Sequence, residues 1–134
     1  MVTSKQFLII AGIILLVLGG LGLVLPEPTG DRSFLWFTAA ENVAHLALGV
    51  VAIAAALVVP ANLQRSLIIL VGVVALVFGI LGFLIAGRET PNLVAGANLE
   101  NPVDNILHLL VGVVALAYAF LGRRVGAKEA SKAG

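Results

Sequence analysis

The sequence predicts an all-α integral membrane protein with four transmembrane helices, and three observations lead to this fold class. Of the 134 residues, 60% are hydrophobic and only 11% are charged, and the mean hydropathy is +1.13. A soluble domain carries about 25% charged residues, so no water-soluble core could hide this much apolar surface. Four apolar runs lack Asp, Glu, Lys and Arg, and each is about long enough to cross a ~30 Å hydrocarbon core as a helix. The runs are Phe7–Leu25, Val43–Val59, Leu67–Ala86 and Ile106–Leu121.

Prolines mark the boundaries of the four runs. None lies inside a run, and Pro26, Pro60, Pro91 and Pro102 all lie between runs, where the missing N–H does no harm. The first run is longer than the ~7–15 apolar residues of a signal peptide, and no A-x-A cleavage site follows it. We therefore expect it to remain as the first helix of a single four-helix transmembrane domain that spans residues 1–134.

The two halves of the chain repeat each other, which predicts a duplicated two-helix hairpin. The stretch ENVAHLALGVVAI (41–53) returns as DNILHLLVGVVAL (104–116). The stretch AGIILLVLGGLGLVL (11–25) returns as VGVVALVFGILGFLI (71–85). Gly12, Gly19 and Gly22 thereby match Gly72, Gly79 and Gly82, each 60 residues later, whereas the His segments are offset by 63 residues.

The repeats also predict how the two copies are related in the membrane. Repeat 1 covers about residues 7–59 and repeat 2 about residues 67–121, and a tail over 122–134 follows. Because each repeat has two spans, both copies enter the membrane in the same direction, which predicts a pseudo-twofold axis along the membrane normal. His45 and His108 should then lie at the same depth, near the outer ends of the second and fourth helices.

Small residues recur at helical spacing and predict the packing faces. The second and fourth helices each carry a stripe that begins with Asn and His and continues through Gly and Ala. The stripes are Asn42, His45, Gly49, Ala52 and Ala56, and Asn105, His108, Gly112, Ala115 and Ala119. Similar seams on the first and third helices consist of Gly12, Gly19, Gly72, Ala75, Gly79 and Gly82. Small residues let helix backbones approach closely in lipid, so we expect a compact four-helix bundle with both histidines pointing inward.

The distribution of basic residues predicts the orientation. Most Lys and Arg residues lie near the N-terminus, in a predicted loop over Ala61–Ser66 or in the C-terminal tail, and only Arg32 and Arg88 lie in the two longer loops. By the positive-inside rule, both termini are cytoplasmic. The predicted location is therefore the cell (plasma) membrane, as a multi-pass protein whose first partner is the lipid bilayer.

The first long loop contains the aromatic stretch SFLWF (Ser33–Phe37), which includes Trp36. We favour its interpretation as an anchor at the outer headgroup layer, because Trp is enriched at membrane interfaces. A lid over the polar site is the alternative.

The candidate site is the acid–Asn–x–x–His phrase that opens the second and fourth helices. Its residues are Glu41, Asn42, His45, Asp104, Asn105 and His108. Acidic residues and Asn are good helix N-caps, and acids complement the positive end of the helix dipole. Reciprocal hydrogen bonds from His45 to Asn105 and from His108 to Asn42 would hold the two hairpins in register. This structural interpretation is the one we favour.

The same phrase, in a chain of four short spans with a basic tail, resembles the small bacterial and archaeal membrane proteins filed as domain of unknown function 4383. That family typically carries N-x-x-H in the second span and D-N-x-x-H-x-x-x-G in the fourth. Asn42, His45, Asn105, His108 and Gly112 occupy the corresponding positions. The resemblance covers essentially the whole chain; it implies the four-helix fold and no activity.

Ionisable side chains are costly within a membrane span, so those that occur there are candidate binding sites, and three such interpretations are possible. Two facing imidazoles could bind a haem or a chlorin through their ring nitrogens. Glu41 with His45, and Asp104 with His108, have i, i+4 spacing and could together bind a divalent metal. The same four groups could pass protons, since His titrates near neutral pH.

Other function classes find little support in the sequence. It contains no nucleophile elbow, phosphate loop or H-E-x-x-H motif, so we do not expect an enzyme. The absence of Cys excludes disulfides and thiolate metal sites, and a net charge of +1 argues against binding of nucleic acid. We predict a structural or interaction module, or an accessory subunit of a membrane complex, without a cofactor. Its partners would be other membrane proteins or a second copy of the chain.

Overall fold

The computed structural model describes residues 2–25, 38–85, 93–94, 97–99 and 102–132. Within these residues the chain forms four helices and one pair of very short strands. In chain order they are α1 (Ser4–Val24), α2 (Ala39–Val58), α3 (Ala61–Ile85), β1 (Leu93–Val94), β2 (Ala97–Asn98) and α4 (Val103–Lys132). Every helix has a stretch that is long and apolar enough to cross a membrane, which in α4 is Val103–Leu121. The predicted all-α fold with four membrane-spanning helices is confirmed.

The start of α2 is set by a capping box. The Thr38 hydroxyl accepts a hydrogen bond from the N–H of Glu41 at 3.2 Å, and the Glu41 carboxylate accepts one from the N–H of Thr38 at 2.6 Å. The box satisfies two backbone donors that a helix start otherwise leaves bare. Thr38 is therefore the N-cap, and the prediction that Glu41 or Asn42 caps this helix is wrong.

The last helix begins earlier and ends later than its apolar run. It starts at Val103, so Asp104 lies inside the first turn rather than at the cap. At its other end the backbone stays helical as far as Lys132, beyond the end of the span at Leu121. The predicted tail thus continues the fourth helix through its described part.

The connection between α2 and α3 is a tight turn at Val59 and Pro60. The predicted loop over Ala61–Ser66 is wrong, because these residues form the first turns of α3. The side chain of Gln64 gives the reason. Its Nε2 donates to the carbonyl oxygens of Val59 at 2.7 Å and of Ala56 at 3.2 Å. The last carbonyls of a helix lack partners within it, so Gln64 closes α2 while its own backbone continues α3.

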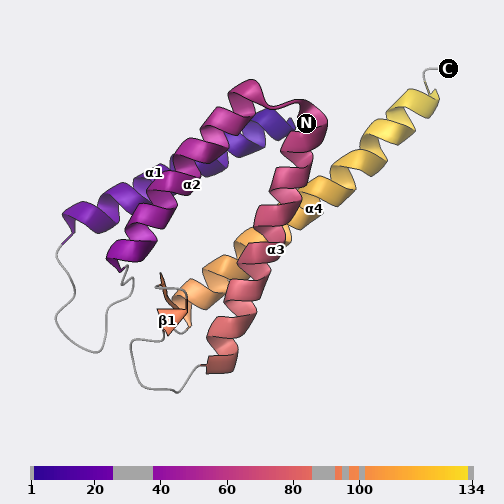
Figure 1. Cartoon of the computed structure of the whole chain (residues 1–134). Coiled ribbons are helices and arrows are strands. Elements are labelled where there is room, and N and C mark those ends of the chain that lie inside the picture. Colours follow the sequence, from indigo (N-terminus) through magenta and orange to yellow (C-terminus); the bar gives the residue numbers. More distant parts are fainter. Residues whose placement is uncertain (1, 26–37, 86–92, 95–96, 100–101, 133–134) are drawn as a thin grey trace.

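The four helices form two antiparallel hairpins, α1–α2 and α3–α4 (Figure 1). The helices of each hairpin pack extensively against each other, whereas the hairpins meet through a smaller contact between α1 and α3. Figure 1 shows the hairpins diverging from the end at which the chain begins. Among the described residues, α2 and α4 share no extensive interface. The arrangement is therefore more open than the compact bundle predicted from the sequence.

Glycines explain the tight packing within each hairpin. A Cβ added to Gly49 would lie 2.8 Å from the carbonyl oxygen of Gly12, and one added to Gly112 would lie 2.9 Å from that of Gly72. Such spacing leaves room for hydrogen only, so the two backbones touch at these points. Both hairpins make this contact at matching positions of the repeat. The seam glycines Gly12, Gly19, Gly49, Gly72, Gly79 and Gly112 are all buried.

The hairpins share a hydrophobic core at the end that carries the N-terminus and the α2–α3 turn, here called the inner end. All four helices contribute to it, through Leu8, Ala55, Ala56, Ile68, Ala115 and Ala119. Tyr118 adds two contacts: its ring stacks on Phe7 with centroids 4.7 Å apart, and its hydroxyl donates to the carbonyl of Val2 at 3.1 Å. Arg65 donates from Nε to the carbonyl of Ala119 at 2.8 Å. These contacts fasten α1, α3 and α4 together at the inner end.

At the opposite, outer end, where α2 and α4 begin, the connection between α3 and α4 packs against the first hairpin. β1 and β2 pair in antiparallel fashion, with Leu93 opposite Asn98. β2 contacts α2, and Leu99 directly after it has no exposed surface. The described part of this connection therefore contacts α2 and buries Leu99.

Substitution of one glycine to alanine tests the seam. Gly49→Ala should lower the melting temperature, because the new methyl group meets the backbone of α1 and overpacking costs about 1–3 kcal/mol. Gly20→Ala is the matched control, since an added Cβ there has nothing within 4 Å. Alanine favours a helix over glycine by about 0.5–1 kcal/mol, so the control should be neutral or stabilising. Thermal unfolding in detergent, followed by circular dichroism, checks both; equal effects would contradict the seam.

Candidate functional site

Six polar residues gather at the outer end and are here called the outer polar cluster. They are Glu41, Asn42 and His45 of α2, and Asp104, Asn105 and His108 of α4. Glu41, Asn42, Asp104 and Asn105 are buried, and both histidines are half-buried. Burial of a polar group is costly unless a partner compensates for the lost water. The partners of these side chains therefore indicate what the cluster does.

Glu41 serves the start of its own helix. Its carboxylate completes the capping box with Thr38 and lies at the positive end of the α2 dipole, which favours a negative charge. Only 5% of the residue is exposed. The carboxylate is thus held at the helix start by backbone contacts.

Asn42 and Asn105 fill spaces that glycine leaves in the neighbouring helix of the same hairpin. A Cβ added to Gly22 would collide with the side-chain amide of Asn42, and one added to Gly82 would collide with that of Asn105. The asparagines therefore seat against α1 and α3, respectively. These contacts are equivalent in the two repeats and extend each glycine seam to the outer end.

The predicted hydrogen bond from His108 to Asn42 is not made. The Oδ1 atom of Asn42 is buried and accepts no hydrogen bond from the residues that the structure describes. The reason is geometric: helical spacing places Asn42 on an inward face, but its side chain packs against Gly22 of its own hairpin. The bond between His45 and Asn105 stays a prediction.

His108 is fixed within the second hairpin instead. Its Nδ1 lies 3.0 Å from the carbonyl oxygen of Asp104 and 3.2 Å from the Asp104 carboxylate, one helical turn away. Its ring stacks on Phe78 of α3, with centroids 5.8 Å apart. The side chains of His108 and Asp104 are 27% and 9% exposed, so this pair is largely screened from water. Asp104 and Phe78 together orient the imidazole.

The ionisable groups of both hairpins lie within reach of one another's charge. His45 is within electrostatic range of His108 and of Asp104, and His108 is within range of Glu41. The apolar runs of α1 and α3 contain no ionisable residue. Two carboxylates and two imidazoles are therefore the ionisable groups that the described helices bring together at the outer end.

This region does not form a metal site by the usual criterion of several ligands around one point. Among the described residues, no group of three or more His, Asp or Glu side chains is arranged to hold a metal ion. Glu41 is turned toward the start of α2, and Asp104 toward its own His108. The four candidate ligands Glu41, His45, Asp104 and His108 thus share a region without converging on a point.

Some of the contributing residues were missed by the sequence analysis. Thr38 could have been found, because T-A-A-E over 38–41 has the capping-box pattern. Phe78 and Leu99 carry no signal of their own, since an apolar residue in a span or loop does not reveal its neighbour. The aromatic stretch around Trp36, interpreted as an anchor or a lid, lies outside the described residues.

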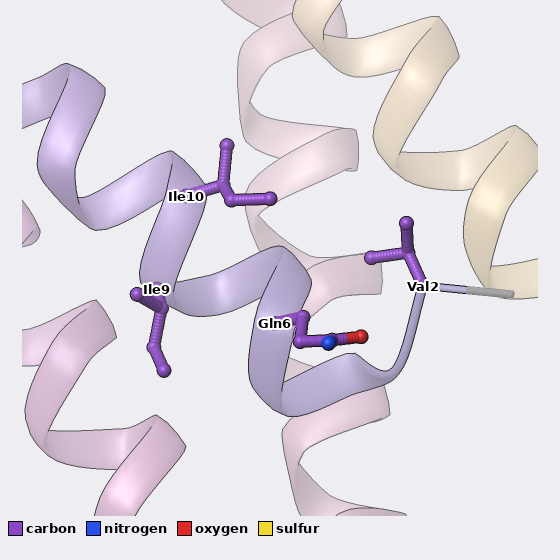
Figure 2. Close-up of a pocket in the computed structure, with 4 residues that line it drawn as sticks. All are labelled: Val2, Gln6, Ile9 and Ile10. Carbon is purple, nitrogen blue, oxygen red and sulfur yellow. The ribbon is translucent and has the colours of Figure 1, made fainter.

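An open depression on the surface lies at the other end of the molecule. It is lined by Val2, Gln6, Ile9 and Ile10 at the start of α1 (Figure 2). None of these residues belongs to the outer polar cluster. The depression is therefore a separate feature.

Comparison of the chain with models of known protein families, with curated proteins and with solved structures gives no match. The resemblance to domain of unknown function 4383 thus rests on the residues of the acid–Asn–x–x–His phrase alone.

A double-mutant cycle tests the contact between Asn42 and Gly22. Gly22→Ala should destabilise the protein by about 1–3 kcal/mol, because the methyl group and the amide need the same space. In an Asn42→Ala background this loss should become smaller, since the three atoms nearest to the added methyl group all belong to the Asn42 side chain. Unfolding of the four variants in detergent gives the coupling energy.

Gly19→Ala provides the control for this cycle. An added Cβ at Gly19 would lie 2.8 Å from the backbone carbonyl of Asn42 and 2.8 Å from Leu46. Truncation of the Asn42 side chain therefore should not relieve it. Additive effects of Gly22→Ala and Asn42→Ala would contradict the packing described here.

Proposed function

We propose that the chain is a structural or interaction module of a membrane complex, an accessory subunit without enzymatic activity. One observation carries this proposal: the outer polar cluster is used largely for helix packing and capping. Glu41 closes the start of α2, Asn42 and Asn105 fill the spaces beside glycines, and Asp104 orients His108. Groups arranged in this way define a helix register rather than a binding cavity.

The lateral surface supports contacts with lipid and with other proteins. Large apolar side chains are exposed on every helix, among them Val17, Leu48, Val74 and Val113. Extensive apolar surface of this kind is covered by a bilayer or by a partner. The limited contact between the hairpins also leaves much of α2 and α4 available. The partners proposed are other membrane proteins or a second copy of the chain.

The proposed location is the cell membrane, with both termini in the cytoplasm. The basic residues at the inner end support this orientation, and the acids at the starts of α2 and α4 mark the outer end. Matching glycine contacts in the two hairpins support a pseudo-twofold relation between the repeats. On this proposal, the two acid–Asn–x–x–His phrases lie at the same depth.

Site-specific photo-crosslinking in the native membrane tests the module directly. Benzoylphenylalanine at Val17, Leu48, Val74 and Val113 samples one exposed position on each helix. A module bound to a partner should give a protein adduct of constant mass from one helix or from two adjacent helices, and lipid adducts from the others. Lipid adducts alone at all four positions would contradict the proposal.

A ligand-binding bundle is the second candidate, favoured by the two imidazoles and two carboxylates within electrostatic range. The ligand would be a haem, a chlorin or a divalent metal, or the groups would relay protons. A visible absorption spectrum of the protein purified from its own membrane tests haem and chlorin. Elemental analysis of the same sample tests the metal, for which the geometry gives no support.

The variant with both His45→Ala and His108→Ala distinguishes the two candidates. If the histidines serve packing, the melting temperature should fall, since the variant loses the stacking of His108 on Phe78 of α3 and its contact with Asp104. The absorption spectrum and metal content should then equal those of the unaltered protein. Unchanged stability together with loss of a bound ligand would favour the second candidate and contradict the first.

A further inference from the structure

The depression at the start of α1 has no part in the proposed function (Figure 2). It offers about 470 Å³, which falls within the ~300–1,000 Å³ of small-molecule sites. It lies on the first turns of a membrane-spanning helix. At this level a helix passes from the lipid headgroups into the hydrocarbon.

The lining of the depression changes from polar to apolar along α1. Gln6 lies at the shallow end, and Figure 2 shows its side chain reaching toward Val2. Ile9 and Ile10 line the depression about one turn further along α1. A phospholipid has the same gradient, from a phosphate that accepts hydrogen bonds to chains that prefer an apolar wall.

The polar donor in this lining is oriented by the helix cap. The Oε1 atom of Gln6 accepts a hydrogen bond from the N–H of Thr3 at 2.9 Å, as part of the capping box of α1. Its NH₂ group is then directed away from the cap, as a donor for an outside acceptor. Gln6 is exposed, so such an acceptor has access to it.

Lys5 directly precedes Gln6 and adds a positive charge to the first turn of α1. It is exposed, and the first turn of α1 contains no acidic residue to neutralise it. The matching residue of the second repeat, Arg65, is instead tied to the carbonyl of Ala119 and lies over the ring of Phe120. The two repeats thus differ in whether the cation at this level is used within the protein.

The depression is held in shape by the second hairpin. Tyr118 donates to the carbonyl of Val2 at 3.1 Å, and its ring stacks on Phe7. Its hydroxyl also lies 3.4 Å from that of Ser4. Ordering of the segment before α1 is therefore part of the fold, which lowers the entropy cost of binding.

We infer that this depression binds a phospholipid with an anionic headgroup from the inner leaflet. The phosphate faces Lys5 and the amide of Gln6, and the upper part of the chains lies along Ile9 and Ile10. Charge complementarity selects an anionic lipid, because a basic side chain near the membrane surface attracts such lipids.

Fluorescence quenching by brominated lipids tests the inference. Trp36→Phe removes the only tryptophan, and Ile13→Trp then reports on the position one turn deeper than the depression. The protein is placed in vesicles of phosphatidylcholine and phosphatidylglycerol, with bromine on one lipid at a time. At equal mole fractions, brominated phosphatidylglycerol should quench more than brominated phosphatidylcholine.

Two matched variants define the site. Val73→Trp places the reporter at the equivalent, exposed position of the second repeat, 60 residues later, where the ratio of the two quenching efficiencies should be smaller. Lys5→Gln in the Ile13→Trp protein should reduce the preference for phosphatidylglycerol about fivefold, which corresponds to ~1 kcal/mol per basic residue. Melting temperatures equal to that of the Trp36→Phe parent show that each variant is folded.

Three results would overturn the inference. The first is equal quenching by both lipids at Ile13→Trp. The second is an undiminished preference after Lys5→Gln. The third is an equally large preference at Val73→Trp, which would show a general attraction to the basic end of the molecule rather than binding in this depression.

Discussion

The close approach of helix backbones at the glycine seams is the constraint on which the rest of this structure depends. In a bilayer, acyl chains are as apolar as Leu or Val, so the hydrophobic effect does little to bring helices together. Dispersion contacts must do so, and these fall off steeply when a gap opens. Gly12 against Gly49, and Gly72 against Gly112, bring the backbones into contact. That contact defines the register, and the register then places Asn42 beside Gly22 and Asn105 beside Gly82.

The same seams account for the divergence of the two hairpins. The glycines of each stripe are used within their own hairpin, whereas the stripe alanines Ala56, Ala115 and Ala119 belong to the core that the hairpins share at the inner end. The hairpins are joined at the inner end by the shared apolar core, and Tyr118 and Arg65 strengthen that junction with polar contacts. At the outer end the buried residues include polar side chains and Leu99. The helices therefore pack closely within each hairpin, and the two hairpins pack against each other at the inner end.

The sequence was sufficient to predict the number of spans and the positions at which backbones come close, because apolar length and the periodicity of small residues are local properties. It was insufficient for the start of α3, since Ala61–Ser66 is polar enough for a loop and is helical because Gln64 bonds back to α2. It was also insufficient for the partner of Asn42. Helical spacing identifies the face on which a residue lies, but not which neighbouring helix occupies that face. The N-cap at Thr38 is a different case. The capping-box pattern T-A-A-E was present in the sequence, but the start of the second helix was predicted from hydropathy instead.

The two repeats have matching residues and contacts at the outer end, but their residues and contacts differ at the inner end. Both acid–Asn–x–x–His phrases are intact, and both asparagines pack on a matching glycine. Tyr118, by contrast, stands where the first repeat has Ala55, 63 residues earlier. Tyr118 binds the segment before α1, and Arg65 binds α4, so the second repeat supplies the contacts that join the hairpins. Lys5, the counterpart of Arg65, is exposed. The two hairpins therefore share a packing rule at the outer end, whereas at the inner end Tyr118 and Arg65 of the second hairpin supply polar contacts that have no counterpart in the described residues of the first.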